Sequence, residues 1–349
     1  MKLRKYWCFL SVIAFFGACS PDDDVYNVVD YNRLGYVLAD NSASFNLSKF
    51  NAAMVRTGMD KTLLGEGPFT VLVPADNVFP YTTVNDVYAE SAKVLGGLVN
   101  YHVLDGNYDF DRFPFLFGQE VRTRSGKPIY VTRWVTEEDT LLMINGRLIE
   151  SEPVMASNGR FIVLDKVLNT KVHDNLNNLI MDDENLSLFS HAIQRTGLSK
   201  LLSEPGAYTV FAPVNGAMVL YGYSSLKDVD NEDIGKLREM IRYHIMPERR
   251  FLNDIKLTMP VDDGIEEWGD WFFFGKNKYG IQYGHMLDGN TVSFKVSVGI
   301  EFWGEPYQGE RELSMLDISN TSINFESKVD QVAGNGVLHT VGNVFKKIN

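Results

Sequence analysis

Cysteine is almost absent from this chain of 349 residues, and its two cysteines, Cys8 and Cys19, both lie near the N-terminus. Beyond Cys19 no thiol is available for a disulfide, a thiolate metal site or a cysteine nucleophile. The folded part must therefore be held by its hydrophobic core alone. The remaining 330 residues are enough for two ordinary domains, each able to bury most of its apolar surface.

Basic residues are also scarce. The chain has 33 Lys and Arg against 45 Asp and Glu, a net charge of −12, and without Lys2, Arg4 and Lys5 the rest carries −15. The pairs Arg249-Arg250 and Lys346-Lys347 are the only basic runs in that rest. Binding to nucleic acid depends on clustered Lys and Arg that neutralise phosphates, so we exclude nucleic acid as a partner.

Sequence motifs of catalysis and metal binding are missing as well. The six histidines (His102, His173, His191, His244, His285 and His339) form no H-E-x-x-H motif and no pair spaced i, i+4. The chain has neither a G-x-S-x-G elbow nor a phosphate-binding G-x-x-x-x-G-K-[ST] loop. We therefore expect no catalytic residues, no metal site and no cofactor, and a protein that is not an enzyme.

The first eighteen residues have the organisation of a signal peptide. The basic residues Lys2, Arg4 and Lys5 precede the uncharged run Trp7 to Ala18, whose twelve residues are too few for a spanning helix of about 20. Phe16-Gly17-Ala18-Cys19 resembles the lipobox of bacterial lipoproteins, which implies diacylation (palmitate-type chains) of Cys19 and a membrane anchor. The alternative is a plain secretory peptide with an incidental Cys19.

An acidic linker, residues 19–29, follows the predicted cleavage site. Its Ser20-Pro21-Asp22-Asp23-Asp24 resembles the export signals of some Gram-negative lipoproteins, which implies an outer-membrane protein that faces the cell exterior. A solvated linker without such a signal is the alternative.

An internal repeat organises the rest of the chain. Residues 46–76 align with 185–215 at a constant offset of 139, with 14 of 31 positions identical. Tyr101-His102 recurs as Tyr243-His244, and Asn158-Gly159 recurs as Asn335-Gly336. We therefore expect two similar domains, residues 30–170 (the first repeat) and 171–349 (the second repeat).

The repeated segment has local signals that predict a helix followed by a strand. Phe50, Ala53 and Met54 share one helical face, and Gly58 is a helix stop. The second repeat has Phe189, Ala192, Ile193 and Gly197 at the matching positions.

The strand Phe69 to Val73 is ended by Pro74, which has no N–H to donate. Asp76 is predicted to cap the helix that follows, as is Asn215. The Asn-Gly pairs predict tight turns before the closing strands 161–164 and 337–341.

These motifs resemble the fasciclin domain family. Thr70-Val-Leu-Val-Pro-Ala-Asp76 and Thr209-Val-Phe-Ala-Pro-Val-Asn215 are similar to its first sequence block. The Tyr-His pairs (Tyr101, His102, Tyr243 and His244) are similar to its central motif. The segments that follow the two Asn-Gly turns are similar to its closing block. The resemblance implies an α+β fold of two tandem domains, each a β-wedge of two small sheets with packed helices. It also implies roles in adhesion and in contact with matrix or polysaccharide, without catalysis.

The Tyr-His pairs are expected to be buried structural residues. The first repeat has Ile162 where the closing block of the family has its histidine, and the second repeat keeps His339 there.

The second repeat carries 35 extra residues between its Tyr-His pair and its Asn-Gly turn, an insertion at about 262–310. The window 266–307 holds 11 aromatic residues in 42 positions, about twice the chain's 12%. The strict alternation over 291–302 predicts a long strand with one buried face, and Trp268 to Phe274 predicts a loop or hairpin. Aromatic rings are common binding anchors, so Trp268, Trp271, Tyr279 and Trp303 are candidate ligand contacts. The alternative is a small satellite core.

The function predicted is therefore a cell-surface lipoprotein that mediates adhesion, or binds a glycan, a matrix component or a partner protein. A structural accessory subunit of an outer-membrane assembly is an alternative. A polysaccharide-active hydrolase is a further one, and it would need two converging carboxylates about 5–9.5 Å apart.

Overall fold

The computed structural model describes residues 29–136, 139–257, 272–274, 279–285, 292–298, 312–318, 328–342 and 344–345. The unit that holds both repeats comprises residues 32–349. Cys19 and the predicted signal peptide lie outside the described residues.

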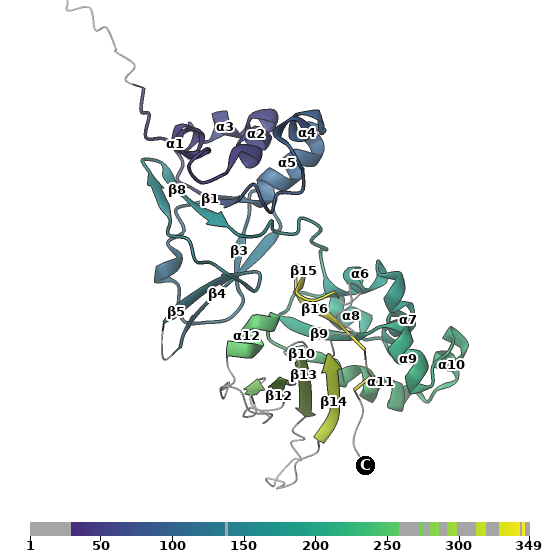
Figure 1. The fold of residues 1–349 in the computed structure, drawn as a ribbon. Helices are drawn as coiled ribbons and strands as arrows, with labels where there is room; N and C mark the ends of the chain where they lie inside the picture. Colours follow the sequence, from purple (N-terminus) through teal and green to yellow (C-terminus); the bar gives the residue numbers. More distant parts are fainter. Residues whose placement is uncertain are drawn as a thin grey trace, which may run out of the picture. The chain divides into compact units, whose positions relative to one another are not determined.

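The first repeat combines a group of short helices with two small sheets (Figure 1). Its helices are α1 (Leu34–Asn41), α2 (Ser48–Thr57), α3 (Met59–Thr62), α4 (Val84–Ala89), α5 (Ala92–Tyr101) and the 3-10 helix η1 (Phe110–Arg112). Its strands are β1 (Phe69–Pro74), β2 (Val103–Asp105), β3 (Gln119–Arg122), β4 (Pro128–Val135), β5 (Thr140–Ile144), β6 (Arg147–Leu148), β7 (Val154–Ala156) and β8 (Gly159–Leu164).

The second repeat has the same order of elements with two additions. Its helices are α6 (Leu176–Met181), η2 (Glu184–Leu186), α7 (Ser187–Thr196), α8 (Ser199–Ser203), α9 (Asn215–Tyr221), α10 (Leu226–Asn231), α11 (Ile234–Tyr243) and α12 (Leu252–Leu257). Its strands are β9 (Tyr208–Pro213), β10 (Ile245–Pro247), β11 (Phe272–Phe274), β12 (Tyr279–His285), β13 (Val292–Val298), β14 (Glu312–Ile318), β15 (Gln331–Ala333) and β16 (Gly336–Val341). The additions are η2 and α9, and α12 stands where the first repeat has η1.

Strand order confirms that the two repeats share one topology. The first repeat has the sheets β2-β1-β8-β7 and β3-β4-β5-β6, and the second has β10-β9-β16-β15 and β11-β12-β13-β14. In each repeat the first strand and the closing strand pair in parallel, β1 with β8 and β9 with β16. The fold is α+β, as expected, with two small sheets in each repeat.

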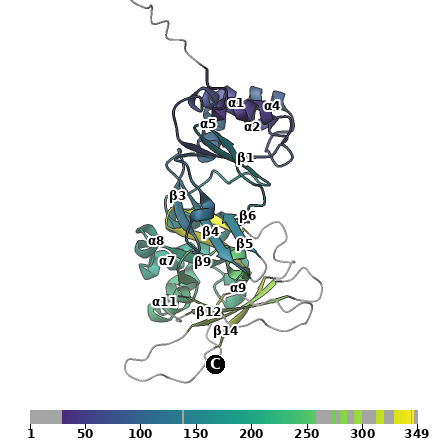
Figure 2. The same cartoon turned by 90° about the vertical axis from the view of Figure 1, so that its left-hand side faces the viewer.

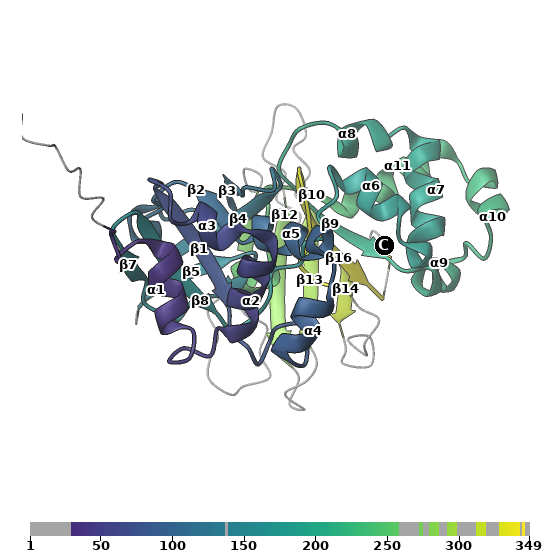
Figure 3. The ribbon, with the colours of Figure 1, turned by 90° about the horizontal axis from the view of Figure 1, so that it is seen from above.

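The central strands of the first repeat are buried on both faces. Val71 and Val73 of β1 belong to the core under the helices, whereas Leu72 belongs to the core against the second sheet. In Figure 2 the helices α1, α2 and α4 gather next to β1, and Figure 3 shows α1 and α2 beside β1 and β8. Because successive strand residues point to opposite faces, one apolar strand serves both cores.

Helices α2 and α7 end at Gly58 and Gly197, as predicted. Gly58 and Gly197 adopt φ values of 75° and 72°, a left-handed conformation that glycine tolerates without strain. Asp76 caps a helix, as predicted, but the helix that it caps is not the predicted one. The Asp76 carboxylate accepts from the N–H groups of Ser48 and Lys49, at 3.1 and 2.8 Å, and so caps the preceding helix α2.

Asn215 does the same for α7, by accepting from Leu188 N–H at 3.0 Å. The reason is tertiary: the end of each central strand lies beside the start of a helix that comes more than twenty residues earlier in the chain. The following helix is nearer in the sequence, and it was predicted as the capped helix for that reason.

Each Asn-Gly turn also connects the closing hairpin to the helices. Asn158 accepts from Leu34 N–H at 2.7 Å, and its amide donates to the carbonyls of Leu63 and Gly65. Asn335 makes the matching three bonds in the second repeat. A Cβ on Gly159 would collide with the Phe69 carbonyl oxygen, which is why only glycine fits beside β1.

The aromatic-rich segment of the second repeat forms that repeat's second sheet. The predicted strand over 291–302 is β13, which is described over Val292–Val298 and pairs with β12 and β14. The predicted hairpin is confirmed in part, because Phe272–Phe274 pairs antiparallel with β12. Since β11 to β14 repeat the order of β3 to β6, the insertion enlarges a sheet that both repeats possess.

Several side chains join the two repeats within the folded unit. The Tyr130 hydroxyl of β4 donates to the carbonyls of Ala333 and Gly334, at 2.8 and 3.0 Å. The Arg249 guanidinium lies 4.1 Å from the centre of the Tyr130 ring and donates to Gly118 O at 2.9 Å. Phe251 enters the core of the first repeat. The apolar and the polar contacts together connect the repeats.

Candidate functional site

The histidines of the Tyr-His pairs are fully buried and serve the fold. His102 Nδ1 donates to Leu98 O at 2.8 Å, and its Nε2 accepts from Leu168 N–H at 3.1 Å. His244 Nδ1 donates to Phe211 O at 2.7 Å, and its Nε2 accepts from Phe345 N–H at 2.9 Å. In both repeats the imidazole therefore fixes the segment that follows the closing strand.

Burial lowers the pKa of both histidines, to about 4 for His102 and about 3 for His244, against an ordinary 6.5. The neutral form is thereby held at neutral pH. Both ring nitrogens are used by the backbone, so neither imidazole is available to a substrate.

The two tyrosines of the motif differ, and the expectation that both are buried was wrong for Tyr243. Tyr101 is 1% exposed, and its hydroxyl donates to Pro128 O at 2.9 Å and accepts from the Asn145 amide at 3.3 Å. Tyr243 is half-buried and donates to Glu239, one turn back on its own helix, at 2.6 Å. The β3–β6 sheet covers the Tyr101 ring, whereas the Tyr243 hydroxyl stays at an exposed helix surface.

The aromatic candidates lie mainly outside the described residues. Trp268, Trp271 and Trp303 are not among them. Tyr279 begins strand β12, where its backbone is paired with Phe274 and Val298. The proposed contacts of these four residues with a ligand stay a prediction.

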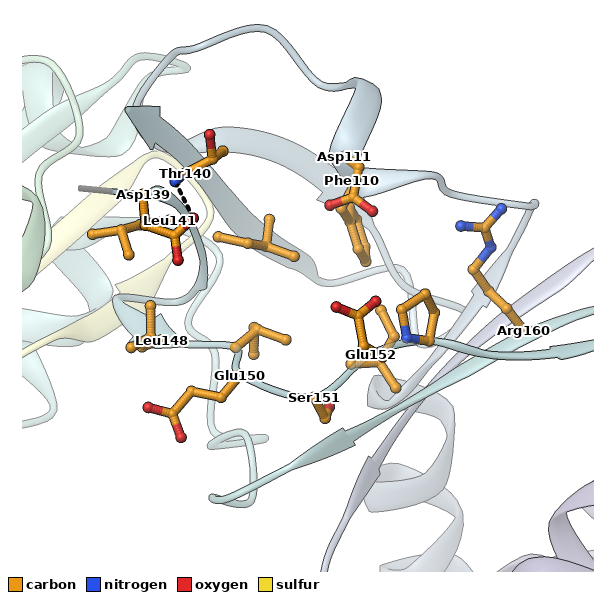
Figure 4. Close-up of a pocket in the computed structure, with 14 residues that line it drawn as sticks. Phe110, Asp111, Asp139, Thr140, Leu141, Leu148, Glu150, Ser151, Glu152 and Arg160 are labelled. Carbon is orange, nitrogen blue, oxygen red and sulfur yellow. Dashed lines mark hydrogen bonds between the residues drawn. The ribbon is translucent and has the colours of Figure 1, made fainter. Parts of the chain in front are cut away.

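A cavity of about 390 Å³ opens in the first repeat, between its second sheet and the closing strand (Figure 4). Ligand pockets in proteins commonly have volumes of roughly 300–1,000 Å³. The segments that line it are η1, the start of β5, the connection from β6 to β7, and β8. The sequence reasoning missed this site, because its residues come from four separate segments and form no motif.

The wall of the cavity is fixed by a tight hairpin. β5 and β6 are joined by Asn145-Gly146, both in the left-handed region with φ of 49° and 73°, the Asn-Gly turn that suits a two-residue hairpin. Asn145 also accepts from Tyr130 N–H at 2.8 Å. The following connection is held where Ile149 N–H donates to Leu142 O and the Ser151 hydroxyl donates to Val163 O. The Asn-Gly signal between two apolar runs could have revealed this hairpin.

The lining divides into an apolar floor and an acidic rim. We define the apolar floor as Phe110, Leu141, Leu142, Leu148, Ile149, Pro153 and Ile162. We define the acidic rim as Asp111, Asp139, Glu150 and Glu152, all of which are exposed. In Figure 4 Asp111 and Glu152 lie on the side nearer to Arg160, and Asp139 and Glu150 lie on the other side.

Among the described residues that line the cavity, Arg160 is the one cation, and it is 8% exposed. Its Nε donates to Asn107 at 2.8 Å, and its Nη1 pairs with Asp109 at 3.2 Å. Asp109 also pairs with Arg112 Nε at 3.0 Å, so these three side chains together carry one formal positive charge. The four carboxylates of the rim outnumber it, and the mouth of the cavity keeps a net negative formal charge.

The arrangement suits binding better than acid catalysis. A glycosidase acid is held protonated by an apolar or crowded site, whereas all four rim carboxylates are exposed to water. Within the described ranges, no group of three or more His, Cys, Asp or Glu side chains is placed to hold a metal ion. Among the same residues, no helix combines the length and apolar character that crossing a bilayer requires.

Comparison with known families places the chain. The Fasciclin domain pattern matches residues 45–170 and 184–347, once in each repeat. The chain belongs to the fasciclin domain family. Each of the two matches includes the central strand, the Tyr-His pair and the closing strand of its repeat, so the tandem arrangement predicted from the sequence is confirmed.

Curated relatives of this fasciclin chain are much longer proteins. Periostin of Homo sapiens is 24% identical over 199 residues, which cover 57% of this chain and 22% of periostin. Stabilin-1 of Mus musculus is 26% identical over 208 residues, 55% of this chain and 8% of stabilin-1. The transforming growth factor-beta-induced protein ig-h3 of Sus scrofa is 26% identical over 170 residues, 47% of this chain and 23% of that protein. The fasciclin chain thus spans less than a quarter of each relative.

A solved structure of similar extent is the fasciclin domain pair of the insect cell adhesion molecule Fasciclin I. It is 14% identical, with a TM-score of 0.34, and covers 86% of this chain and 97% of its own.

Proposed function

We propose that this fasciclin chain is a lipid-anchored binding protein of the cell surface, which holds a glycan, a matrix component or a partner protein and catalyses no reaction. The observation that carries the proposal is the pair of fasciclin domains joined in one folded unit, with an open cavity in the first of them. The histidines of the Tyr-His pairs are hydrogen-bonded to the backbone, so a partner would bind at the surface or in the cavity.

The aromatic residues Trp268, Trp271, Tyr279 and Trp303 are proposed as a second contact surface. Three of the five tryptophans of the chain fall in this insertion, and tryptophan and tyrosine contribute large contact areas at low entropic cost. Trp268 and Trp271 are therefore the residues to change when binding is tested.

The binding function is tested with the purified full-length protein on a glycan array and by cross-linking to cell-envelope proteins. We expect a saturable glycan or protein ligand whose affinity falls at least tenfold in Trp268→Ala/Trp271→Ala, because interface tryptophans are frequent hot spots. The melting temperature should barely change. Release of soluble sugar from a polysaccharide, with no stable complex, would contradict the proposal and favour a hydrolase.

The lipid anchor at Cys19 is supported by the order of basic, apolar and small residues before it. Two acyl chains anchor a protein stably, whereas one gives marginal binding. Mass spectrometry of the mature protein should show an acylated Cys19 as its first residue, and Cys19→Ala should release the protein from the membrane fraction. An unmodified N-terminus at another residue would exclude the anchor.

A further inference from the structure

The cavity of the first repeat has one chemical asymmetry: an apolar floor under a rim of one charge. Phe110 and Ile162 at the floor are buried, and Leu148 at the mouth is 37% exposed. The floor can therefore receive an apolar chain, while the rim stays in contact with water.

The rim charge is uncompensated within the described part of the chain. The side chains of Asp111, Glu150 and Glu152 form no hydrogen bond or ion pair with any described residue. The Asp139 side chain accepts from Thr140 N–H at 2.6 Å, and the Asp139 backbone both donates to and accepts from Thr136. Negative charges around one opening make the local electrostatic potential more negative and attract cations. Arg160 is directed to Asp109 and Asn107 and pairs with none of the four rim carboxylates.

An occupant must therefore be apolar along its stem and positive at its end. Lysine and arginine side chains have this build, because their methylene stems cover apolar surface while the charged group stays in water. A neutral glycan could donate hydroxyl hydrogen bonds to the rim carboxylates but would not balance their charge, and an anion would be repelled by them.

On these grounds, and resting on the proposed binding function, we propose that the cavity binds a lysine or arginine side chain from a basic, partly apolar segment of a partner protein. The stem lies on the apolar floor, and the cation meets Glu150, Glu152 and their neighbours at the rim. The partner surface is thus positively charged, which complements a chain of net charge −12.

The test uses the purified full-length protein and three fluorescent, amidated peptides in which leucine alternates with lysine, glutamate or serine. We expect the Leu-Lys peptide to bind and the other two to bind at least tenfold more weakly. The double variant Glu150→Gln/Glu152→Gln should weaken binding of the Leu-Lys peptide about tenfold, because two exposed ion pairs of ordinary strength are lost. Leu148→Ser should weaken it about threefold through lost apolar contact.

The matched control is Glu66→Gln/Glu184→Gln, which removes two exposed carboxylates elsewhere on the chain and so the same net charge. Its affinity for the Leu-Lys peptide should stay within twofold of that of the unchanged protein. Equal losses in both double variants would show attraction to net charge alone and overturn the proposal. Displacement of the peptide by millimolar Ca²⁺ that binds by itself would overturn it too, in favour of a cation site.

The same variants separate this inference from the proposed function. In one outcome, the full-length protein still binds its glycan or protein ligand while Glu150→Gln/Glu152→Gln changes neither the affinity for that ligand nor the affinity for the Leu-Lys peptide. That result would support the proposed binding function and contradict the cavity assignment. If no ligand of any kind is bound, the proposed function itself fails. Unchanged melting temperatures confirm that the exposed substitutions leave the fold intact.

Discussion

At the scale of single residues, the two motif histidines show how one side chain can close a domain. Each imidazole donates from Nδ1 to a carbonyl oxygen. Its Nε2 accepts from a backbone N–H that lies 66 residues further along the chain for His102 and 101 residues further for His244. The acceptors differ, Leu98 of helix α5 in the first repeat and Phe211 of strand β9 in the second. The common bond is the one to the segment after the closing strand. The histidine of the motif therefore stabilises the fold by holding the segment after the closing strand in place.

This bonding makes the stability of the fold depend on pH. The folded-state pKa of His244, about 3, lies below the ordinary value of 6.5, so the unfolded chain takes up the proton first as pH falls. The contribution of His244 is full above about pH 6.5 and is lost progressively as pH falls through 5 towards 3. His102, with a pKa of about 4, acts in the same direction over a slightly narrower range.

His244→Ala should lower the free energy of unfolding at pH 7.5 by roughly 1–3 kcal/mol, because the Phe345 N–H and the Phe211 carbonyl lose a buried partner. At pH 5 the deficit should shrink by about 2 kcal/mol, since the unchanged protein has by then lost that much to protonation of the unfolded chain. Urea denaturation at both pH values measures this. His191→Ala is the control, because the half-buried His191 pairs with Asp230 at the surface and should cost less than about 1 kcal/mol. A deficit that does not change with pH would show that His244 has the same pKa in the folded and unfolded chains, and would contradict the lowered pKa.

At the scale of elements, the correct predictions concern helix ends, strand ends and turns, which depend on residues close together in the sequence. The helices that end at Gly58 and Gly197, the strands that end at Pro74 and Pro213, and both Asn-Gly turns have the predicted positions. Each depends on backbone conformations that nearby residues favour or forbid. The internal repeat doubled every signal, which is why two similar domains could be predicted.

The misses at this scale all involve partners that are distant in the sequence. Asp76 has the chemistry of a cap, but only the fold shows that the N–H groups it accepts from belong to α2. Tyr243 matches Tyr101 in sequence, yet only Tyr101 is covered by Pro128 and Asn145. The cavity has the same origin, since η1 and the β6–β7 connection meet only in three dimensions. Periodicity and capping rules do not contain this information.

At the scale of the whole molecule, the two repeats meet around one buried carboxylate. Asp254 of α12 is fully buried, and its Oδ2 accepts from Phe251 N–H at 2.9 Å. Thr132 of the first repeat also donates to this carboxyl group, while its Oγ1 accepts from Gly118 N–H at 3.0 Å. Arg250 and Asp330 are the charged neighbours. Burial raises the pKa of Asp254 to about 7, against an ordinary 3.8.

Asp254 and the histidines therefore act in opposite directions between pH 4 and 6.5. A raised pKa means that the Asp254 contribution is full below about pH 3.8 and is lost as pH rises through 7, because the unfolded chain ionises first. The histidine contributions fade over the same range as pH falls. Opposed slopes of this kind flatten the dependence of stability on pH.

Replacing Asp254 with asparagine should remove only the acidic half of this balance. Asparagine keeps an oxygen to accept from Phe251 N–H, but it carries no charge that must be buried at high pH. We expect Asp254→Asn to gain stability relative to the unchanged protein, by roughly 2–3 kcal/mol more at pH 8 than at pH 5. Urea denaturation at the two pH values measures the difference, with the exposed Asp165→Asn as a control that should show none. If Asp254→Asn instead destabilises the protein equally at both pH values, the carboxylate is ionised in the fold and paired with Arg250 of the same repeat. The pH balance described above would then not exist.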